Sequence, residues 1–144
     1  AVARALDAVG ITGLRDRSYT AISGGERQLV LIARGLAQGA GCLLMDEPTA
    51  HLDPHHQHDV LSIVRRLTNE GFAFVLTSHH PNNALLYADE VLFLADGASI
   101  TRGAPAVAIT EDSLRAAYGM EFEIMHGTNG TRAILPRVRD RATV

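Results

Sequence analysis

Apolar residues recur every three or four positions along five stretches of the chain, and this spacing predicts helices. The stretches cover residues 2–9, 24–39, 54–70, 81–88 and 111–118. The third stretch has Asp53 at its cap position and Pro54 in its first turn, which is a common way for a helix to begin. The first stretch is periodic from its start, so we expect that the chain opens in mid-helix and is part of something longer.

Continuous apolar runs lie between the helical stretches and predict strands. Residues 42–45 and 72–76 carry no polar side chain, which is typical of strands buried on both faces of a parallel sheet. Residues 91–95 and 98–101 flank Asp96-Gly97, a pair that favours a tight hairpin turn. Helices and strands in this alternating order predict an α/β fold with a parallel sheet.

Composition narrows the class of protein. A chain of 144 residues with 47% hydrophobic and 20% charged residues suits one folded domain rather than a disordered chain. The net charge of −3 argues against a broad basic surface for nucleic acid. Cys42 is the one cysteine, which excludes an intrachain disulfide framework, and we expect it to be a small buried hydrophobe. No apolar run is long enough to span a bilayer.

Two adjacent carboxylates, Asp46 and Glu47, follow the first predicted strand. Ligands of α/β proteins bind at the carboxyl ends of the strands, and side chains alternate in direction along an extended chain. One carboxylate can therefore hold a hydrated Mg²⁺ while the other aligns or deprotonates a water molecule. A solvated acidic turn is the alternative explanation of this pair.

Ser23, Gly24 and Gly25 stand directly before the second helical stretch. Two glycines permit close approach to the backbone, and a helix N-terminus offers free N–H groups and a positive dipole end. The segment is therefore a candidate anion site. An ordinary serine cap after a turn is the alternative.

Together these segments resemble the ATP-binding subunits of ABC transporters. The matching segments are ISGGERQ at 22–28 (signature motif), MDEPT at 45–49 (Walker B strand), AHLD at 50–53 (D-loop) and His79 (switch histidine). Glu26 stands where Gln is more usual, and Ala50 stands where Ser is usual. The motifs follow the family's order and its approximate spacing over residues 1–119. The resemblance implies the three-layer P-loop NTPase fold of ABC-type ATPases, with ATP and Mg²⁺ as ligands.

The resemblance also implies roles for the matched positions. Asp46 would hold Mg²⁺ through water, Glu47 would be the general base, and His79 would contact the γ-phosphate. The remaining matched positions would bind the nucleotide of the opposite subunit or lie at the dimer seam; they are Ser23, Gly24, Gly25, Glu26 and Asp53.

All 13 basic residues are arginines, and the chain contains no lysine. A phosphate-binding loop of the form G-x-x-x-x-G-K-[ST] needs its lysine to reach the β- and γ-phosphates. That loop, Walker A, is therefore missing from these residues. We interpret residues 1–119 as the C-terminal part of an ABC ATPase domain and residues 120–144 as a C-terminal extension.

Four histidines between residues 51 and 58 suggest a different site. Imidazole is a favoured ligand of transition metals, and His51 and His55 are four residues apart. However, Asp53-Pro54 restarts the chain between them, and no second cluster completes a set of four ligands. A polar helix start near the dimer interface is the preferred interpretation.

Two further segments resemble one importer branch, which takes up iron–siderophore, haem, cobalamin or molybdate complexes. They are residues 79–89, with the pattern H-x-x-N-x-A…Y-A-D, and residues 114–119. The resemblance implies a second ATP-binding subunit, membrane permease subunits, indirectly a substrate-binding protein, and no nucleic acid. It implies a peripheral position on the cytoplasmic face of the membrane. The alternatives are a non-transport ABC-type ATPase and a non-catalytic remnant.

Overall fold

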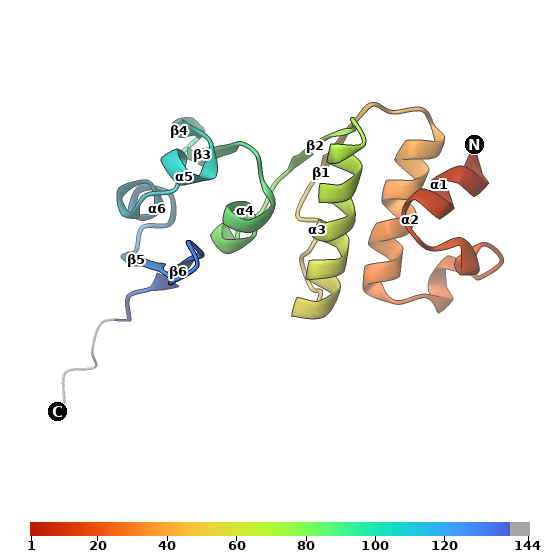
Figure 1. Ribbon diagram of the computed structural model, residues 1–144, viewed down its shortest axis with the longest axis horizontal. Coiled ribbons are helices and arrows are strands. Elements are labelled where there is room, and N and C mark those ends of the chain that lie inside the picture. The colour runs from red at the N-terminus through yellow and green to blue at the C-terminus, as the bar shows by residue number, and fades with distance from the viewer. Residues whose placement is uncertain (139–144) are drawn as a thin grey trace. The chain divides into compact units, whose positions relative to one another are not determined.

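The computed structural model describes residues 1–138 and divides the chain into two compact units, with the division after His79. The α-helices and strands of each unit are labelled in Figure 1. None of the helices in residues 1–138 is both long enough and apolar enough to cross a membrane. The sequence-based boundary between an ATPase domain at residues 1–119 and an extension at residues 120–144 lies elsewhere, and it remains a prediction.

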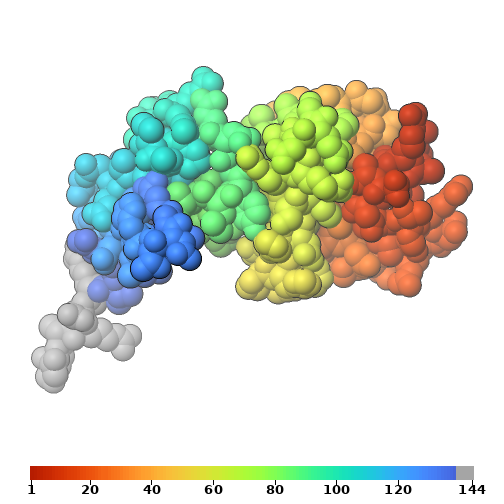
Figure 2. Space-filling model, in the orientation of Figure 1, coloured from red at the N-terminus to blue at the C-terminus, as the bar shows by residue number. Residues whose placement is uncertain are grey.

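The first unit contains three α-helices, two short 3-10 helices and a pair of strands. These are α1 (Val2–Ala8), η1 (Thr12–Leu14), η2 (Tyr19–Ala21), α2 (Gly24–Ala37), β1 (Cys42–Met45), α3 (Pro54–Asn69) and β2 (Ala73–Leu76). Each of the helices and strands expected from the sequence in this region is present. The atoms of α1, α2 and α3 form one continuous surface, coloured red, orange and yellow in Figure 2.

The core of the first unit is formed mainly by apolar side chains of α1, α2 and α3. Ile32, Val60 and Leu67 are fully buried, and Val9 of the first helical pattern joins them. Leu43 of β1 packs into the same core, against Gly35 of α2. An ideal Cβ on Gly35 would lie 2.7 Å from Leu43 Cδ2, so α2 approaches β1 closely only because residue 35 is glycine.

The strands β1 and β2 are parallel, as expected, but they are not buried on both faces. They form a two-stranded sheet in which Leu43 pairs with Phe74 and Leu44 with Val75. The side chains of Leu44 and Val75 are 79% and 56% exposed. Because successive side chains of a strand point to opposite faces, the helices cover only the face that carries Leu43. No element of the first unit, residues 1–79, covers the opposite face.

The prediction that Cys42 is buried is wrong for the same reason. Cys42 is a free, exposed cysteine at the start of β1. Its position alternates with Leu43, so its side chain lies on the face of Leu44 rather than in the core.

The second unit contains three helices and two antiparallel hairpins. These are α4 (Pro81–Tyr87), β3 (Val91–Ala95), β4 (Ala98–Gly103), α5 (Pro105–Ala108), α6 (Glu111–Tyr118), β5 (Phe122–His126) and β6 (Arg132–Pro136). The expected Asp96-Gly97 turn is present, with positive φ angles of 50° and 74° at its two residues. Both residues lie in the region that a tight hairpin turn of this kind requires.

The expected extension at 120–144 contains a hairpin in its described part. The strands β5 and β6 pair from Phe122 opposite Pro136 to His126 opposite Arg132, and Phe122 and Ile134 are buried. The side chain of Asn82 in α4 attaches β6, because it accepts from Ile134 N at 2.8 Å and donates to Ile134 O at 2.9 Å. The last part of the extension, residues 139–144, lies outside the described residues.

Candidate functional site

The carboxyl ends of β1 and β2 meet at one edge of the sheet. Met45 lies opposite Leu76, and the next residue, Thr77, donates from its backbone N to Met45 O at 3.0 Å. Because the strands are parallel, Asp46 and Thr77 leave the sheet side by side. This is the edge at which α/β sheets bind ligands.

The hydroxyl of Thr77 fixes both carboxylate residues. It donates to Asp46 Oδ1, and it accepts from Glu47 N at 2.9 Å. Thr77 is not among the candidate residues chosen from the sequence. The signal that points to it is its position directly after the second strand, because in a parallel pair this position lies beside the residue that follows the first strand.

Glu47 has an unusual backbone conformation, with φ at +44°. A non-glycine residue in the left-handed region costs on the order of 1–3 kcal/mol and persists where its surroundings hold it. Here the Thr77 hydroxyl holds Glu47 N, and Glu47 O accepts from Ala50 N at 3.0 Å to close a turn. Such strain gathers at functional sites, which adds a structural reason to single out Glu47.

The carboxylate of Glu47 also contacts a histidine. Glu47 Oε1 lies 3.3 Å from His79 Nε2, and the two residues come from different segments of the chain. The Glu47 side chain is 23% exposed, while that of His79 is 87% exposed. The imidazole therefore lies on the solvent side of the carboxylate. The structure thus brings together three residues selected from the sequence: Asp46, Glu47 and His79.

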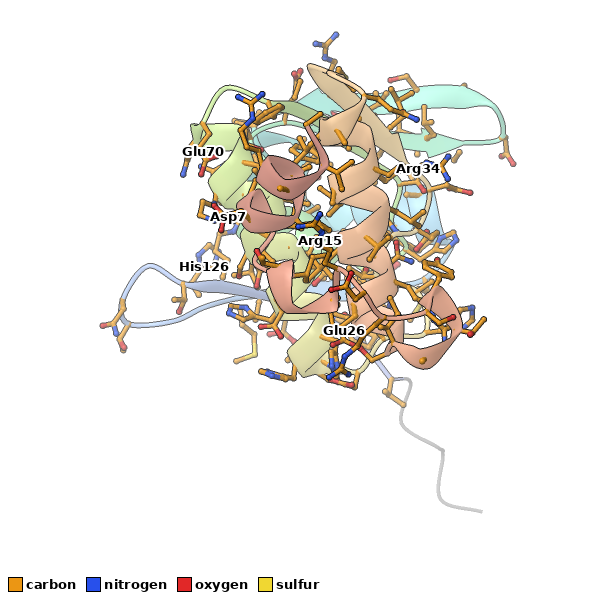
Figure 3. All side chains as sticks on the ribbon, turned by 90° about the vertical axis from the view of Figure 1, so that its right-hand side faces the viewer. Asp7, Arg15, Glu26, Arg34, Glu70 and His126 are labelled. Carbon is orange, nitrogen blue, oxygen red and sulfur yellow. The ribbon has the colours of Figure 1, made fainter. Side chains whose placement is uncertain are left out.

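A second group surrounds the start of α2. Ser23 Oγ accepts from Glu26 N at 3.2 Å, and Glu26 Oε2 accepts from Ser23 N at 2.7 Å, which completes a capping box. The hydrogen bond that the Ser23 backbone N–H donates to the Glu26 carboxylate, and then the hydrogen bond with the Ser23 side chain, lower the pKa of Glu26. Glu26 lies at one end of α2 and Arg34 near the other, as Figure 3 shows, so both charges complement the helix dipole.

The glycines at the start of α2 keep their N–H groups available. The first N–H groups of a helix have no intrahelical partner, and the capping box satisfies those of Ser23 and Glu26. The backbone N–H groups of Gly24 and Gly25 are therefore the donors that the capping box does not use. An anion that approaches this helix end would meet these two groups together with the Ser23 side chain.

The same glycines pack against the segment after β1. An ideal Cβ on Gly24 would lie 3.2 Å from Leu52 Cδ2, and one on Gly25 would lie 2.7 Å from His56 Cδ2. A side chain at position 25 would require His56 to move. The close approach expected of these glycines therefore has a partner within the chain itself, which the sequence did not indicate.

Asp53 caps α3, as the sequence predicted. Its Oδ1 accepts from the backbone N of His55 at 3.0 Å and of His56 at 3.1 Å, and its Oδ2 lies 2.5 Å from His56 Nδ1. The hydrogen bond from the His56 side chain lowers the pKa of Asp53, and the same bond raises the pKa of His56. The two groups are therefore oppositely charged at mildly acidic pH.

The remaining histidines of the 51–58 segment make separate contacts. His55 Nε2 lies 3.5 Å from Asp59 Oδ2, and His58 Nε2 lies 3.4 Å from Ser62 Oγ. His51 occupies the left-handed region, with φ at +64°. No three potential metal ligands converge anywhere in residues 1–138.

Known proteins of one family are similar to this chain. The sequence profile of the ABC transporter family matches residues 1–50. The chain is 47% identical to the hemin import ATP-binding protein HmuV of Deinococcus radiodurans, over 83% of this chain and 48% of that protein. The chain belongs to the ABC transporter family. It is also 46% identical to the cobalamin import ATP-binding protein BtuD of Halobacterium salinarum, over 81% of this chain and 30% of that protein.

A solved structure gives the same result for the fold. An ABC transporter assigned to the metal-chelate type, in an inward-facing conformation, matches with a TM-score of 0.87 at 30% identity. The match covers 95% of this chain and 56% of that one. The predicted α/β fold of ABC-type ATPases is thereby confirmed. The chain spans about half the length, or less, of these relatives.

Magnesium requires oxygen ligands in octahedral geometry, and proteins usually supply one or two carboxylates while phosphates and water supply the rest. Asp46 is exposed and uses its Oδ1 for Thr77, and Glu47 is its neighbour. These residues therefore fit Mg²⁺ if a carboxylate supplies one ligand and phosphate and water supply the others. They do not form a complete protein cage for the ion.

Proposed function

We propose that the chain is part of an ABC-type ATPase that powers the import of a metal chelate. The carboxyl ends of β1 and β2 carry its catalytic residues, and the start of α2 carries its signature motif. The observation that carries the proposal is the group Asp46, Glu47, Thr77 and His79 at the carboxyl ends of two parallel strands. In this proposal ATP is the substrate, and its γ-phosphoryl group is transferred to water.

Glu47 orients the attacking water and accepts its proton. Its carboxylate is partly buried, and its backbone is held in a strained conformation by the hydroxyl of Thr77. His79, 3.3 Å away and largely exposed, hydrogen-bonds the γ-phosphate beside the water. This arrangement suits phosphoryl transfer, in which catalysis consists mainly of positioning and neutralisation of charge.

Asp46 would hold a hydrated Mg²⁺, and the ion would neutralise charge that develops on the phosphate oxygens. The hydroxyl of Thr77 restrains Asp46 Oδ1, so Oδ2 is the oxygen that would be available to the hydrated ion. The same hydroxyl joins the ion-binding residue to the backbone of the general base.

Ser23, Gly24 and Gly25 bind the γ-phosphate of a nucleotide held mainly by a second ATP-binding subunit, and Asp53 lies at the seam between the subunits. The two available glycine N–H groups support this role. Glu26 takes part through the capping box, since its carboxylate holds Ser23 N and so shapes the helix end. Because the chain has no lysine, the loop that holds most of the triphosphate lies outside these 144 residues.

The cargo and partners follow from the relatives. The curated relatives are named for import of hemin and of cobalamin, and both are metal chelates. We propose a cargo of the iron–siderophore, haem, cobalamin or molybdate type. The partners are a second ATP-binding subunit, the membrane permease subunits and, through them, a substrate-binding protein. The subunit then lies on the cytoplasmic face of the membrane.

The test uses a complete ATP-binding subunit, meaning these 144 residues preceded by a phosphate-binding loop. Glu47→Gln keeps the shape of the side chain but cannot accept a proton, so ATP binding is retained and turnover nearly disappears. Nucleotide titration and phosphate release measure the two effects. If hydrolysis stayed within about threefold, a barrier change below ~1 kcal/mol, Glu47 would not be the base.

A further inference from the structure

The side chain of His56 lies between two segments that the proposed function uses. One edge of its ring carries Nδ1, which is 2.5 Å from Asp53 Oδ2. The other edge carries Cδ2, the atom that stands where a side chain on Gly25 would lie. The imidazole therefore separates the carboxylate that caps α3 from the first turn of α2.

The contact with Gly25 is close and belongs to a larger surface. Gly25 is buried, and its ideal Cβ would lie 2.7 Å from His56 Cδ2 and 3.2 Å from both Cβ and Cγ. His56 also lines a cavity of about 310 Å³ together with Ser23, Gly25 and Glu26. A displacement of the ring would therefore reach the backbone whose N–H groups bind the nucleotide in the proposed function.

The charges around His56 are mostly acidic. Asp53 and Asp59 face it from its own helix, Glu26 faces it from α2, and the ring of His55 lies 5.6 Å away edge to face. Arg17 acts on Glu26 in turn. A carboxylate only accepts hydrogen bonds, so Nδ1 carries a hydrogen in both states and Nε2 is the nitrogen that titrates.

We propose that His56 is a positioning residue that joins Asp53 to the start of α2 and, when protonated, supplies the positive charge that offsets Glu26 beside the nucleotide. The inference rests on the proposed function and adds a residue to it. His56 does not touch the phosphate. It acts through the backbone of Gly24 and Gly25 and through the local potential.

The protonation of His56 predicts the direction of the pH effect. Its pKa is raised from the ordinary 6.5 by Asp53, so the charged form persists above pH 6.5 and is lost as the pH rises through the raised value. Affinity for the anionic nucleotide is therefore greatest below this range and falls above it. A change of about fivefold in the KM for ATP is expected from one nearby charge, with kcat changed less.

Three variants of the complete subunit separate the contributions. His56→Asn keeps a donor at the position of Nδ1 but does not titrate. His56→Leu keeps apolar bulk against Gly25 but has no donor. His55→Asn is the matched control, because His55 is in the same helical turn and its side chain is 78% exposed.

Two measurements are made on each variant: the KM and kcat for ATP across pH 6–9, and the amide NMR shifts of Gly24 and Gly25 across the same range. We expect both amides to follow the His56 imidazole titration in the wild type and in His55→Asn, and to lose it in His56→Asn. The wild-type rise in KM disappears in His56→Asn, and His56→Leu has the highest KM at low pH.

If the amide shifts of Gly24 and Gly25 did not change as His56 titrates, the coupling between His56 and these glycines would be overturned. A KM whose pH profile is the same in wild type and His56→Asn would overturn the functional part, as would a wild-type profile in His56→Leu. If the subunit did not bind ATP at any pH, the proposed function would fail, while the NMR titration would still decide whether His56 is coupled to the glycines.

Discussion

At the scale of single residues, the two adjacent histidines after β2 have different positions. His79 Nε2 lies 3.3 Å from Glu47 Oε1, whereas His80 is the residue that precedes the first turn of α4. In the complete subunit we expect His79→Ala to lower kcat by about 100-fold or more. His80→Ala is expected to remain within about threefold. Phosphate release by both variants is the measurement, and equal losses would mean that the wrong histidine has been assigned.

Thr77 provides a second test at this scale, because one hydroxyl holds both Asp46 and the backbone of Glu47. Thr77→Val has nearly the same shape without the hydroxyl, so it releases both restraints at once. We expect kcat to fall about tenfold, which corresponds to ~1.4 kcal/mol, because two hydrogen bonds of about 0.5–1.5 kcal/mol each are lost. Thr77→Ser retains the hydroxyl and serves as the control. Comparable activity of the valine and serine variants would show that the hydroxyl has no part in catalysis.

At the scale of elements, α2 and α6 both begin with a capping box, but the two boxes lie in different parts of the molecule. Ser23 and Glu26 form one capping box, and Thr110 and Ser113 form the other. Removal of either cap, by Ser23→Ala or Thr110→Ala, is expected to cost about 1 kcal/mol of stability. Denaturant unfolding of the complete subunit measures this cost.

Only the first of these caps lies at the proposed nucleotide surface. Ser23→Ala should therefore also reduce ATP turnover, whereas Thr110→Ala should leave the turnover of the folded protein unchanged. The comparison at matched stability separates the two effects. A turnover loss that is the same in both variants would mean that the start of α2 acts on stability alone.

At the scale of the whole molecule, we predict that these 144 residues expressed alone will neither bind Mg-ATP tightly nor hydrolyse it. Micromolar binding requires about 8 kcal/mol. A helix terminus contributes about 0.3–1 kcal/mol at an exposed site. No lysine is present to add to it. Nucleotide titration and a phosphate-release assay, with Glu47→Gln as the control, test this. Micromolar affinity with turnover that depends on Glu47 would contradict the prediction and would mean that an arginine replaces the lysine.

The exposed face of the β1–β2 sheet leads to a second prediction for the isolated chain. Leu44 and Val75 are adjacent in register and largely exposed, so this face should bind a hydrophobic dye or promote association. Leu44→Gln combined with Val75→Thr should reduce dye fluorescence. Val107→Thr removes another exposed apolar side chain, 73% exposed in the second unit, and should not reduce it. Equal fluorescence from all three proteins would show that the sheet face is not the binding surface.

Local patterns were sufficient for most of the fold. The cap residues Ser23 and Asp53, the Asp96-Gly97 turn and the terminating Gly119 act on their immediate neighbours, so their effects are visible in a few consecutive residues. The hairpin β5–β6 was not expected. It depends on packing of Phe122 and Ile134 and on the side chain of Asn82, which is 52 residues away from Ile134.

The sequence by itself determined the family, the order of the motifs and the residue types at the strand ends, because these depend on neighbours along the chain. Only the tertiary structure decided which contacts Thr77, His56, Gly24 and Gly25 make, because the register of β1 with β2 and the approach of α3 to α2 bring distant segments together. Burial was decided there too. A run such as residues 42–45 is apolar at every position, so its sequence cannot indicate which face is covered. The packing of α2 on Leu43 determines it and leaves Cys42 and Leu44 exposed.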